Sequence, residues 1–209
     1  MPEPKQDRAI RTREEIIRAA AEVFDERGYN GASMREIMKR AGVTLGAVYF
    51  HFPNKEAIAR EVMNSQPDTI LPRLTSQGLQ QVVDITLVWS RQLQSDPTLR
   101  AGVRLAVEQS GLDWRDTSSY TAWEKIFEEC LLLARERGEL LGHVSPRDMA
   151  GFLVGACTGV QLYSDLLYRR ADLTQRTVNM WELLLPGVAG PDIAGQIKVS
   201  VRRASALAG

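Results

Sequence analysis

Apolar residues recur at helical spacing along most of this 209-residue chain, and no segment shows the strict two-residue alternation of a half-buried strand. The first clear stripe has the i, i+4, i+7, i+8 spacing of one helix face and consists of Ile16, Ala20, Val23 and Phe24. We expect this helix to begin near Thr12, where Thr12 and Glu15 form a capping box, and to end at Gly28. The pattern predicts an all-α protein of about nine or ten helices.

Two short helices are expected next, joined by a turn of three residues. The first begins at Ser33, where Ser33 and Glu36 form a capping box, and ends near Arg40. Gly42 gives the turn its backbone freedom, and Thr44 caps the second helix. Two helices joined this tightly form a helix-turn-helix, in which the second helix can enter the major groove of DNA.

Further helical stripes fill the rest of the chain, separated by turn residues. We expect helices over residues 55–65, 76–94, 98–109, 120–137, 146–168, 173–185 and 192–207, with a polar loop at 111–119. Pro67 and Pro72 loosen the chain after the first of these helices and are expected to mark the boundary between an N-terminal module and the rest. The pattern predicts an N-terminal helix-turn-helix module of three helices, residues 8–55, followed by a larger helical domain, residues 56–209.

One expected helix is apolar around much of its circumference, from residue 149 to residue 162. A helix with so little polar surface must be buried inside its domain or against a partner. Two-fold reading of DNA requires a stable dimer. We therefore expect this helix and the one at 173–185 to form the seam of a homodimer.

Composition and charge narrow the setting in which the chain works. The formal net charge of +0 excludes a strongly basic field around the whole protein but allows a local DNA-binding patch, and the N-terminal arm carries Lys5, Arg8, Arg11 and Arg13. Cys130 and Cys157 have no pairing spacing, which indicates a reducing compartment. Without a membrane-length apolar run or a signal-peptide pattern, we expect a cytoplasmic protein with no membrane partner.

Residues 12–55 resemble the TetR family of transcriptional regulators. The resemblance is carried by Thr12, Arg13, Ile16, Ala20, residues 24–29, Ile37, residues 41–44, Gly46, residues 49–52 and residues 54–56. Within the family, residues 48–52 and 99–106 resemble the γ-butyrolactone receptor group of actinomycetes. The resemblance implies a homodimeric repressor whose C-terminal domain, here 56–209, binds a small signalling molecule and then releases pseudo-palindromic operator DNA.

The second helix of the motif is the expected recognition helix. Val48 and Phe52 are one turn apart and face the core, which leaves Leu45, Gly46, Tyr49 and His51 toward the groove. The small side chains of Gly46 and Ala47 let the start of the helix, capped by Thr44, approach the bases closely.

By resemblance, phosphate is contacted by Tyr49, His51 and Lys55, with Arg13 added from the arm. The alternative is that residues 49–52 are merely an aromatic core stripe. Many relatives carry lysine at the position of Leu45, and leucine can pack only on a thymine methyl or a sugar.

Four residues are candidates for the ligand site. Trp123 aligns by resemblance with the tryptophan of the signal pocket, and its indole offers an apolar face and one N–H donor. By resemblance, Gln66 matches a polar position at the mouth of that pocket, and Thr158 and Trp89 are further candidates. The alternatives are a core tryptophan for Trp123, a surface amide for Gln66 and a hydroxyl bonded to its own helix for Thr158.

No nucleophile–base pair, metal-ligand spacing or cofactor loop stands out, so we expect no catalytic activity, no cofactor and no metal. Two other functions stay open. The chain could be a pseudo-receptor regulator that takes a different ligand, such as an antibiotic, or none. It could also be an enzyme with an incidental helix-turn-helix.

Overall fold

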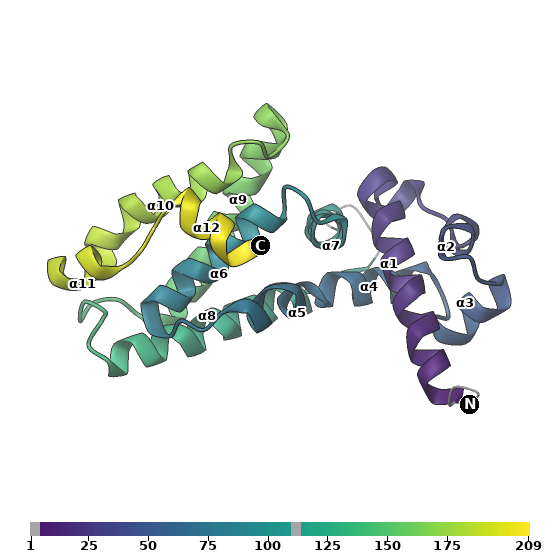
Figure 1. Cartoon of the computed structure of the whole chain (residues 1–209), viewed down its shortest axis with the longest axis horizontal. Coiled ribbons are helices and arrows are strands. Elements are labelled where there is room, and N and C mark those ends of the chain that lie inside the picture. Colours follow the sequence, from purple (N-terminus) through teal and green to yellow (C-terminus); the bar gives the residue numbers. More distant parts are fainter. Residues whose placement is uncertain (1–4, 110–113) are drawn as a thin grey trace. The chain divides into compact units, whose positions relative to one another are not determined.

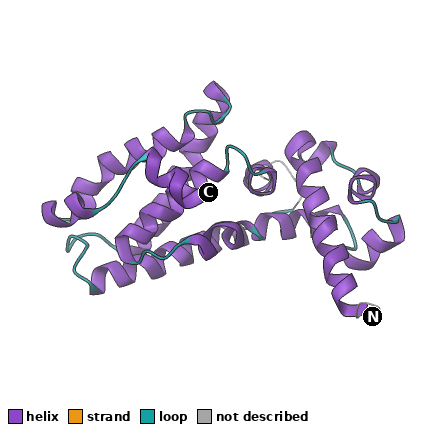
Figure 2. Ribbon diagram, viewed as in Figure 1, coloured by secondary structure: helices purple, strands orange, loops and turns teal. Residues whose placement is uncertain are grey.

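The computed structural model describes residues 5–109 and 114–209, and all regular structure in these ranges is helical (Figures 1 and 2). The helices are α1 Lys5–Gly31, α2 Met34–Ala41, α3 Leu45–His51, α4 Lys55–Asn64, α5 Gln66–Ile70, the 3-10 helix η1 Leu71–Arg73, α6 Gly78–Gln92, α7 Pro97–Glu108, α8 Ser118–Glu136, α9 Pro146–Tyr168, α10 Leu173–Val188, α11 Pro191–Gln196 and α12 Val201–Ala208. The all-α prediction is confirmed.

Helix α1 begins at Lys5 rather than near Thr12, so the capping box expected at Thr12 and Glu15 is wrong. The sequence between these points contains neither glycine nor proline, and Asp7 lies in the first turn, where a carboxylate favours a helix N-terminus. Gly28 interrupts the helical dihedrals with φ 68° and ψ 179°. A positive φ of this kind is one that glycine adopts freely and that other residues rarely adopt.

The first compact unit comprises residues 1–66 and 96–119. Within it α7 packs along α1, and α4 packs against both of them. The guanidinium of Arg100 on α7 donates to both carboxylate oxygens of Asp25 on α1, at 2.6 to 3.0 Å. This unit is larger than the DNA-binding domain expected at 8–55, because α4 and α7 share the core of α1.

The second compact unit comprises residues 67–95 and 120–209. Helix α6 packs against α10 and α12, and α10 also packs against α9. Nearly every residue of α6 is buried, including Asp84, Thr86 and Ser90. The indole N–H of Trp181 on α10 donates to the Thr86 hydroxyl at 2.7 Å, which satisfies two polar groups inside this core.

The helix expected at 192–207 is two helices, because the backbone of a residue between them bonds to a side chain of α6. The Lys198 N–H donates to Oε1 of Gln80 at 2.7 Å, and its carbonyl accepts from Nε2 of Gln80 at 3.1 Å. A backbone held this way cannot continue a helix, so α12 starts anew with Ser200 as its N-cap.

Prolines interrupt the helices less than the sequence predicts. Helix α10 continues through Pro186 to Val188, although proline has no N–H to donate to the carbonyl four residues before it. Pro67 and Pro72 lie in α5 and η1 rather than in a loose segment. Of the expected loop at 111–119, residues 111–113 lie outside the described residues, and α8 already begins at Ser118.

Candidate nucleic-acid interface and ligand domain

Local hydrogen bonds build the helix-turn-helix as the sequence predicts. The Ser33 hydroxyl accepts from the Glu36 N–H at 3.3 Å, and the Ser33 N–H donates to the Glu36 carboxylate at 3.1 Å. Gly42 ends α2 with φ 67° and ψ 23°, the left-handed region that glycine adopts freely. The Thr44 hydroxyl then accepts from the Ala47 N–H at 3.2 Å and caps α3. The expected capping box, glycine turn and threonine cap are confirmed.

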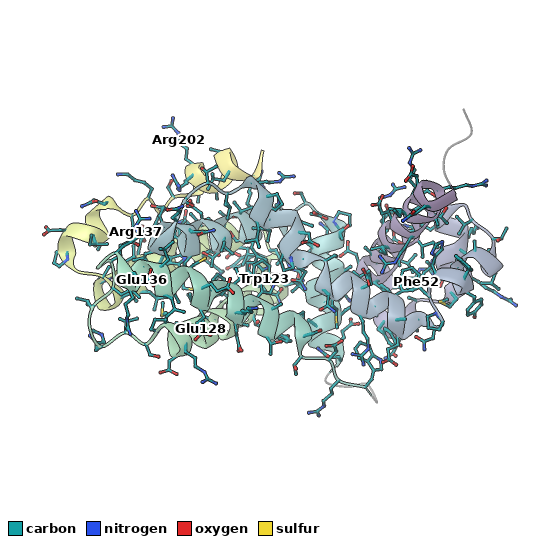
Figure 3. The ribbon with its side chains drawn as sticks, turned by 90° about the horizontal axis from the view of Figure 1, so that it is seen from below. Phe52, Trp123, Glu128, Glu136, Arg137 and Arg202 are labelled. Atoms are coloured by element: carbon teal, nitrogen blue, oxygen red, sulfur yellow. The ribbon has the colours of Figure 1, made fainter. Side chains whose placement is uncertain are left out.

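Burial divides α3 into two faces. Val48 and Phe52, the residue that follows the helix, are buried, as expected. Figure 3 labels Phe52. Gly46, Tyr49 and Phe50 are exposed, with 50% of Tyr49 and 80% of Phe50 accessible. Leu45, Ala47 and His51 are half-buried.

The exposed face therefore consists of Gly46, Tyr49 and Phe50. Sequence reasoning missed Phe50, which it considered only in the alternative of an aromatic core stripe. Its position four residues after Gly46 was the available signal, because residues at i and i+4 share a helix face. The Phe50 ring meets the His51 ring edge-on, with centroids 5.1 Å apart.

Two cations expected on phosphates are bound within the first unit. Lys55 Nζ donates to the carbonyls of Tyr29 at 2.6 Å and Ala32 at 2.9 Å. Burial lowers the pKa of Lys55. Arg13 pairs with Glu61 at 2.7 Å, and its guanidinium lies 5.2 Å from the centre of the Phe52 ring. Phosphate contacts by Arg13 and Lys55 stay a prediction, and both residues position α3 and α4 here.

Other basic side chains of the first unit are exposed. They are Arg8 of α1 and Arg35 and Lys39, which lie one turn apart on α2. Sequence reasoning did not single out Arg35 and Lys39, although their spacing predicts a shared helix face. Arg40 is bound instead, with Glu22 at 3.2 Å and Glu26 at 2.9 Å.

The residues predicted for the ligand site do not all lie in one compact unit. Trp89, Trp123 and Thr158 belong to the second unit, whereas Gln66 belongs to the first. Both tryptophans are buried, and the Trp123 ring stacks on the Phe127 ring, with centroids 6.0 Å apart. No hydrogen bond or ring contact of the described residues joins Trp89, Trp123 and Thr158.

Two of the predicted polar groups are bonded locally. The Thr158 hydroxyl donates to the Val154 carbonyl at 2.8 Å, which is the alternative we gave for it. Gln66 is buried rather than a surface amide, and its Nε2 donates to the Met63 carbonyl at 3.0 Å. Their roles as ligand contacts stay predictions.

Two buried polar atoms of the second unit were missed. Gln92 Oε1 and Thr174 Oγ1 are buried and accept no hydrogen bond within the described ranges. Unpaired buried polar atoms are costly, and a ligand that bears donors could satisfy them. Sequence patterns gave no signal for either, because pairing depends on neighbours distant in the chain.

The described residues contain no group of three or more His, Cys, Asp or Glu side chains that could hold a metal ion. Their helices also include none that is long and apolar enough to cross a bilayer. Cys130 and Cys157 are free thiols, and burial raises their pKa values to about 11 and about 12.

The helix-turn-helix and the helical C-terminal part together define a bacterial transcriptional regulator. Residues 16–62 match the family described as bacterial regulatory proteins, tetR family, and residues 76–190 match the tetracyclin repressor-like C-terminal domain. The chain belongs to the TetR family.

Among its relatives, the chain is similar to the A-factor receptor protein of Streptomyces griseus, with 38% identity over 93% of this chain and 70% of that protein. Its structure is similar to full-length native TylP, a TetR regulator from Streptomyces fradiae, with a TM-score of 0.88 and 39% identity over 96% of this chain and 97% of that one. It is also similar to CprB from Streptomyces coelicolor in complex with its operator sequence, with a TM-score of 0.72 and 31% identity over 96% and 98% of the two chains.

Proposed function

We propose that this chain is a DNA-binding transcriptional repressor that a small signalling molecule of the γ-butyrolactone type releases from its operator. The observation that carries the proposal is a fully capped helix-turn-helix in a chain that is 38% identical to an A-factor receptor over 93% of its length. The proposal assigns the chain a binding function and no catalytic step.

DNA binding is assigned to residues 8–55, with α3 in the major groove. Thr44, Leu45, Gly46, Ala47, Tyr49 and His51 are the proposed contacts of α3, joined by Arg13 and Lys55. The helix carries no side chain that pairs bidentately with a base edge, so close approach and apolar contacts must contribute to sequence reading. The related CprB has been solved with its operator, which supports this use of the motif.

A homodimer is proposed because the second unit exposes a large apolar surface on neighbouring helices. The exposed apolar residues of α9 and α10 are Phe152, Leu162, Tyr163, Leu166, Leu167, Tyr168 and Leu183. Leu166 and Leu183 are 84% and 82% exposed, which is costly for leucine in water. A second copy that covers this surface would form a two-fold dimer, and helix-turn-helix dimers place their recognition helices about 34–36 Å apart, one turn of DNA.

Ligand binding is assigned to residues 56–209, with the indoles of Trp89 and Trp123 against the apolar part of the ligand. Gln66 and Thr158 are proposed to turn from their local carbonyls toward its oxygens. Ligand and DNA would then favour different spacings of the two recognition helices. By reciprocal coupling, each would weaken the binding of the other.

An electrophoretic mobility shift on the DNA upstream of the protein's own coding sequence tests the proposal. We expect retarded DNA that is freed by one of a set of γ-butyrolactones, butenolides and furan acids. Failure to retard any DNA would overturn the proposal. An enzyme with an incidental helix-turn-helix would instead turn over one of these compounds, which mass spectrometry of the mixture would detect.

The alternative of a pseudo-receptor is favoured by one observation, namely that Nε2 of Gln66 and the hydroxyl of Thr158 donate to local carbonyls. Such a regulator would take a different ligand, for example an antibiotic, or none. Retarded DNA that none of the lactones releases, but that an unrelated antibiotic does, would identify this function.

A further inference from the structure

Four side chains in the first compact unit form a series in which two aromatic rings lie between two cations: Lys55, Tyr29, Trp114 and Arg60. Lys55 Nζ lies 4.3 Å from the centre of the Tyr29 ring. The Tyr29 ring meets the Trp114 ring at 68° with centroids 5.4 Å apart, and the guanidinium of Arg60 lies 5.0 Å from the Trp114 ring centre. The two cation–ring distances are in the range in which a cation is attracted to a ring face, and the two rings meet in the favourable edge-to-face arrangement.

At one end, the series holds the entrance to the helix-turn-helix. Lys55 is the first residue of α4, and only three residues separate it from the end of the recognition helix. Its ammonium binds the carbonyls of Tyr29 and Ala32, which lie between the kink at Gly28 and the N-cap of α2. Lys55 and Tyr29 therefore fix how the chain enters α2 and leaves α3.

At the other end, the series is attached to the start of α8. Arg60 forms an ion pair with Asp116, and Asp116 also accepts from the Ser118 N–H at 2.9 Å. The Ser118 hydroxyl, in turn, donates to the side-chain oxygen of Asn64 on α4 at 2.9 Å. Ser118 is the first residue of α8, the helix that carries Trp123 five residues later.

Lys55 and Arg60 both belong to α4, so this helix joins the two ends through its backbone, and Trp114 joins them through side chains. Its indole touches Tyr29 on one side and Arg60 on the other. Its N–H is buried and makes no hydrogen bond to the described part of the chain. A buried donor without a partner is unfavourable, so the indole is held here by its ring contacts rather than by its polar group.

We propose that Trp114 is a positioning residue that couples the start of α8 to the helix-turn-helix. A change at α8 is transmitted through Asp116 and Arg60 to Trp114, and from Trp114 through Tyr29 and Lys55 to the ends of α2 and α3. This inference rests on the proposed function in one respect, since it assumes that α8 responds to the ligand.

The test measures how strongly a lactone weakens DNA binding, which is a ratio of two dissociation constants. For the wild type we expect a ratio within the range of about 5–150 that is typical of allosteric coupling. The variant Trp114→Leu keeps an apolar side chain but loses the ring, and we expect its ratio to fall below about 2 while lactone affinity, measured by calorimetry, stays unchanged. The matched control Trp114→Phe keeps a ring between Arg60 and Tyr29 and should retain most of the ratio.

A loss of stability alone would not produce this result, because it affects both dissociation constants equally. If Trp114→Leu does not fold, Arg60→Met breaks the same series at a side chain that is 35% exposed, and the same fall in the ratio is expected. If a lactone releases Trp114→Leu or Arg60→Met protein from DNA as readily as the wild type, that result would falsify the inference and leave the proposed function standing. A wild type that binds no DNA would overturn both.

If no lactone releases the wild-type protein from DNA, fluorine NMR of protein labelled with 5-fluorotryptophan tests the role of Trp114 without a ligand. The chain has 4 tryptophans, and single substitutions assign their resonances. We expect the Trp114 resonance to move when the retarded duplex is added, and that of the buried Trp181 to stay in place. A Trp114 resonance that does not respond to DNA would overturn the inference.

Discussion

Arg203 of α12 holds the buried carboxylate of Asp84 on α6 through two hydrogen bonds of 2.6 Å each. Asp84 is 0% exposed and also accepts from Ser76 at 2.6 Å and from Gln80 at 2.9 Å. Hydrogen bonding to Asp84 raises the pKa of Arg203, so the guanidinium stays charged. This contact attaches the C-terminal helix to the central helix of the second unit.

We expect Arg203→Met to lower the free energy of unfolding by about 3 kcal/mol, because it leaves a buried carboxylate without its counter-charge. Urea denaturation measures the change. The control is Arg202→Met, since Figure 3 shows Arg202 extending away from the ribbon into solvent. Equal effects of the two substitutions would contradict a role for the Asp84 pair.

Phe50 provides a test of how the recognition helix reads DNA. Its 80% exposed ring can gain free energy in the major groove by covering the methyl group of a thymine. We expect replacement of that thymine by deoxyuridine, which lacks only the methyl, to cost the wild type about 0.8 kcal/mol, or about fourfold in affinity. Fluorescence anisotropy measures both duplexes.

The control for Phe50 is the same pair of duplexes with Phe50→Ala. This variant should bind both with nearly equal affinity, because the side chain that senses the methyl group is absent. If no thymine in the operator distinguishes the wild type from the variant in this way, Phe50 does not read thymine methyls.

The exposed leucines of α9 and α10 predict the outcome of charge substitution at the proposed dimer surface. In a two-fold interface each residue occurs twice, and burial of one leucine contributes about 1.5–3 kcal/mol. Leu166→Glu should therefore raise the dimer dissociation constant at least about 100-fold, as measured by analytical ultracentrifugation. The control Leu132→Glu changes an exposed leucine of α8, and dissociation by this variant as well would argue against the α9–α10 surface.

The thiol of Cys130 is expected to react slowly with alkylating reagents. Burial and, secondarily, Glu129 raise its pKa to about 11 from the model-compound value of 9.0. At pH 8 the thiolate fraction is then roughly 100-fold smaller than in the unfolded chain, and labelling by iodoacetamide should slow by the same factor. Mass spectrometry of a Cys157→Ser background isolates Cys130, and labelling at the rate of a free cysteine would show that the thiol is not buried.

The same pKa shift affects stability in alkaline solution. Above pH 9 the unfolded state loses the thiol proton while the folded state keeps it, so the folded state binds more protons. The free energy of unfolding should therefore fall between about pH 9 and pH 11, and less so in Cys130→Ala.

The sequence by itself determined the parts of this protein that depend on neighbours a few residues apart. The capping box of Ser33 and Glu36, the left-handed Gly42 and the Thr44 cap are closed by hydrogen bonds within three residues or by a single backbone conformation. The burial of Val48 and Phe52 follows from helical period alone. These features were predictable because their free energy comes from the local chain.

Only the tertiary structure decided the features that depend on distant residues. Lys55 binds carbonyls that lie 23 and 26 residues before it, and Gln80 separates α11 from α12 by binding Lys198, which lies 118 residues away. Side chains such as these choose among several partners, and the choice depends on which polar groups folding brings together in places with little access to water. Spacing along a helix contains no such information. For this reason no role for Trp114 could be predicted from the sequence, and its contacts with Tyr29 and Arg60 are seen only in the folded chain.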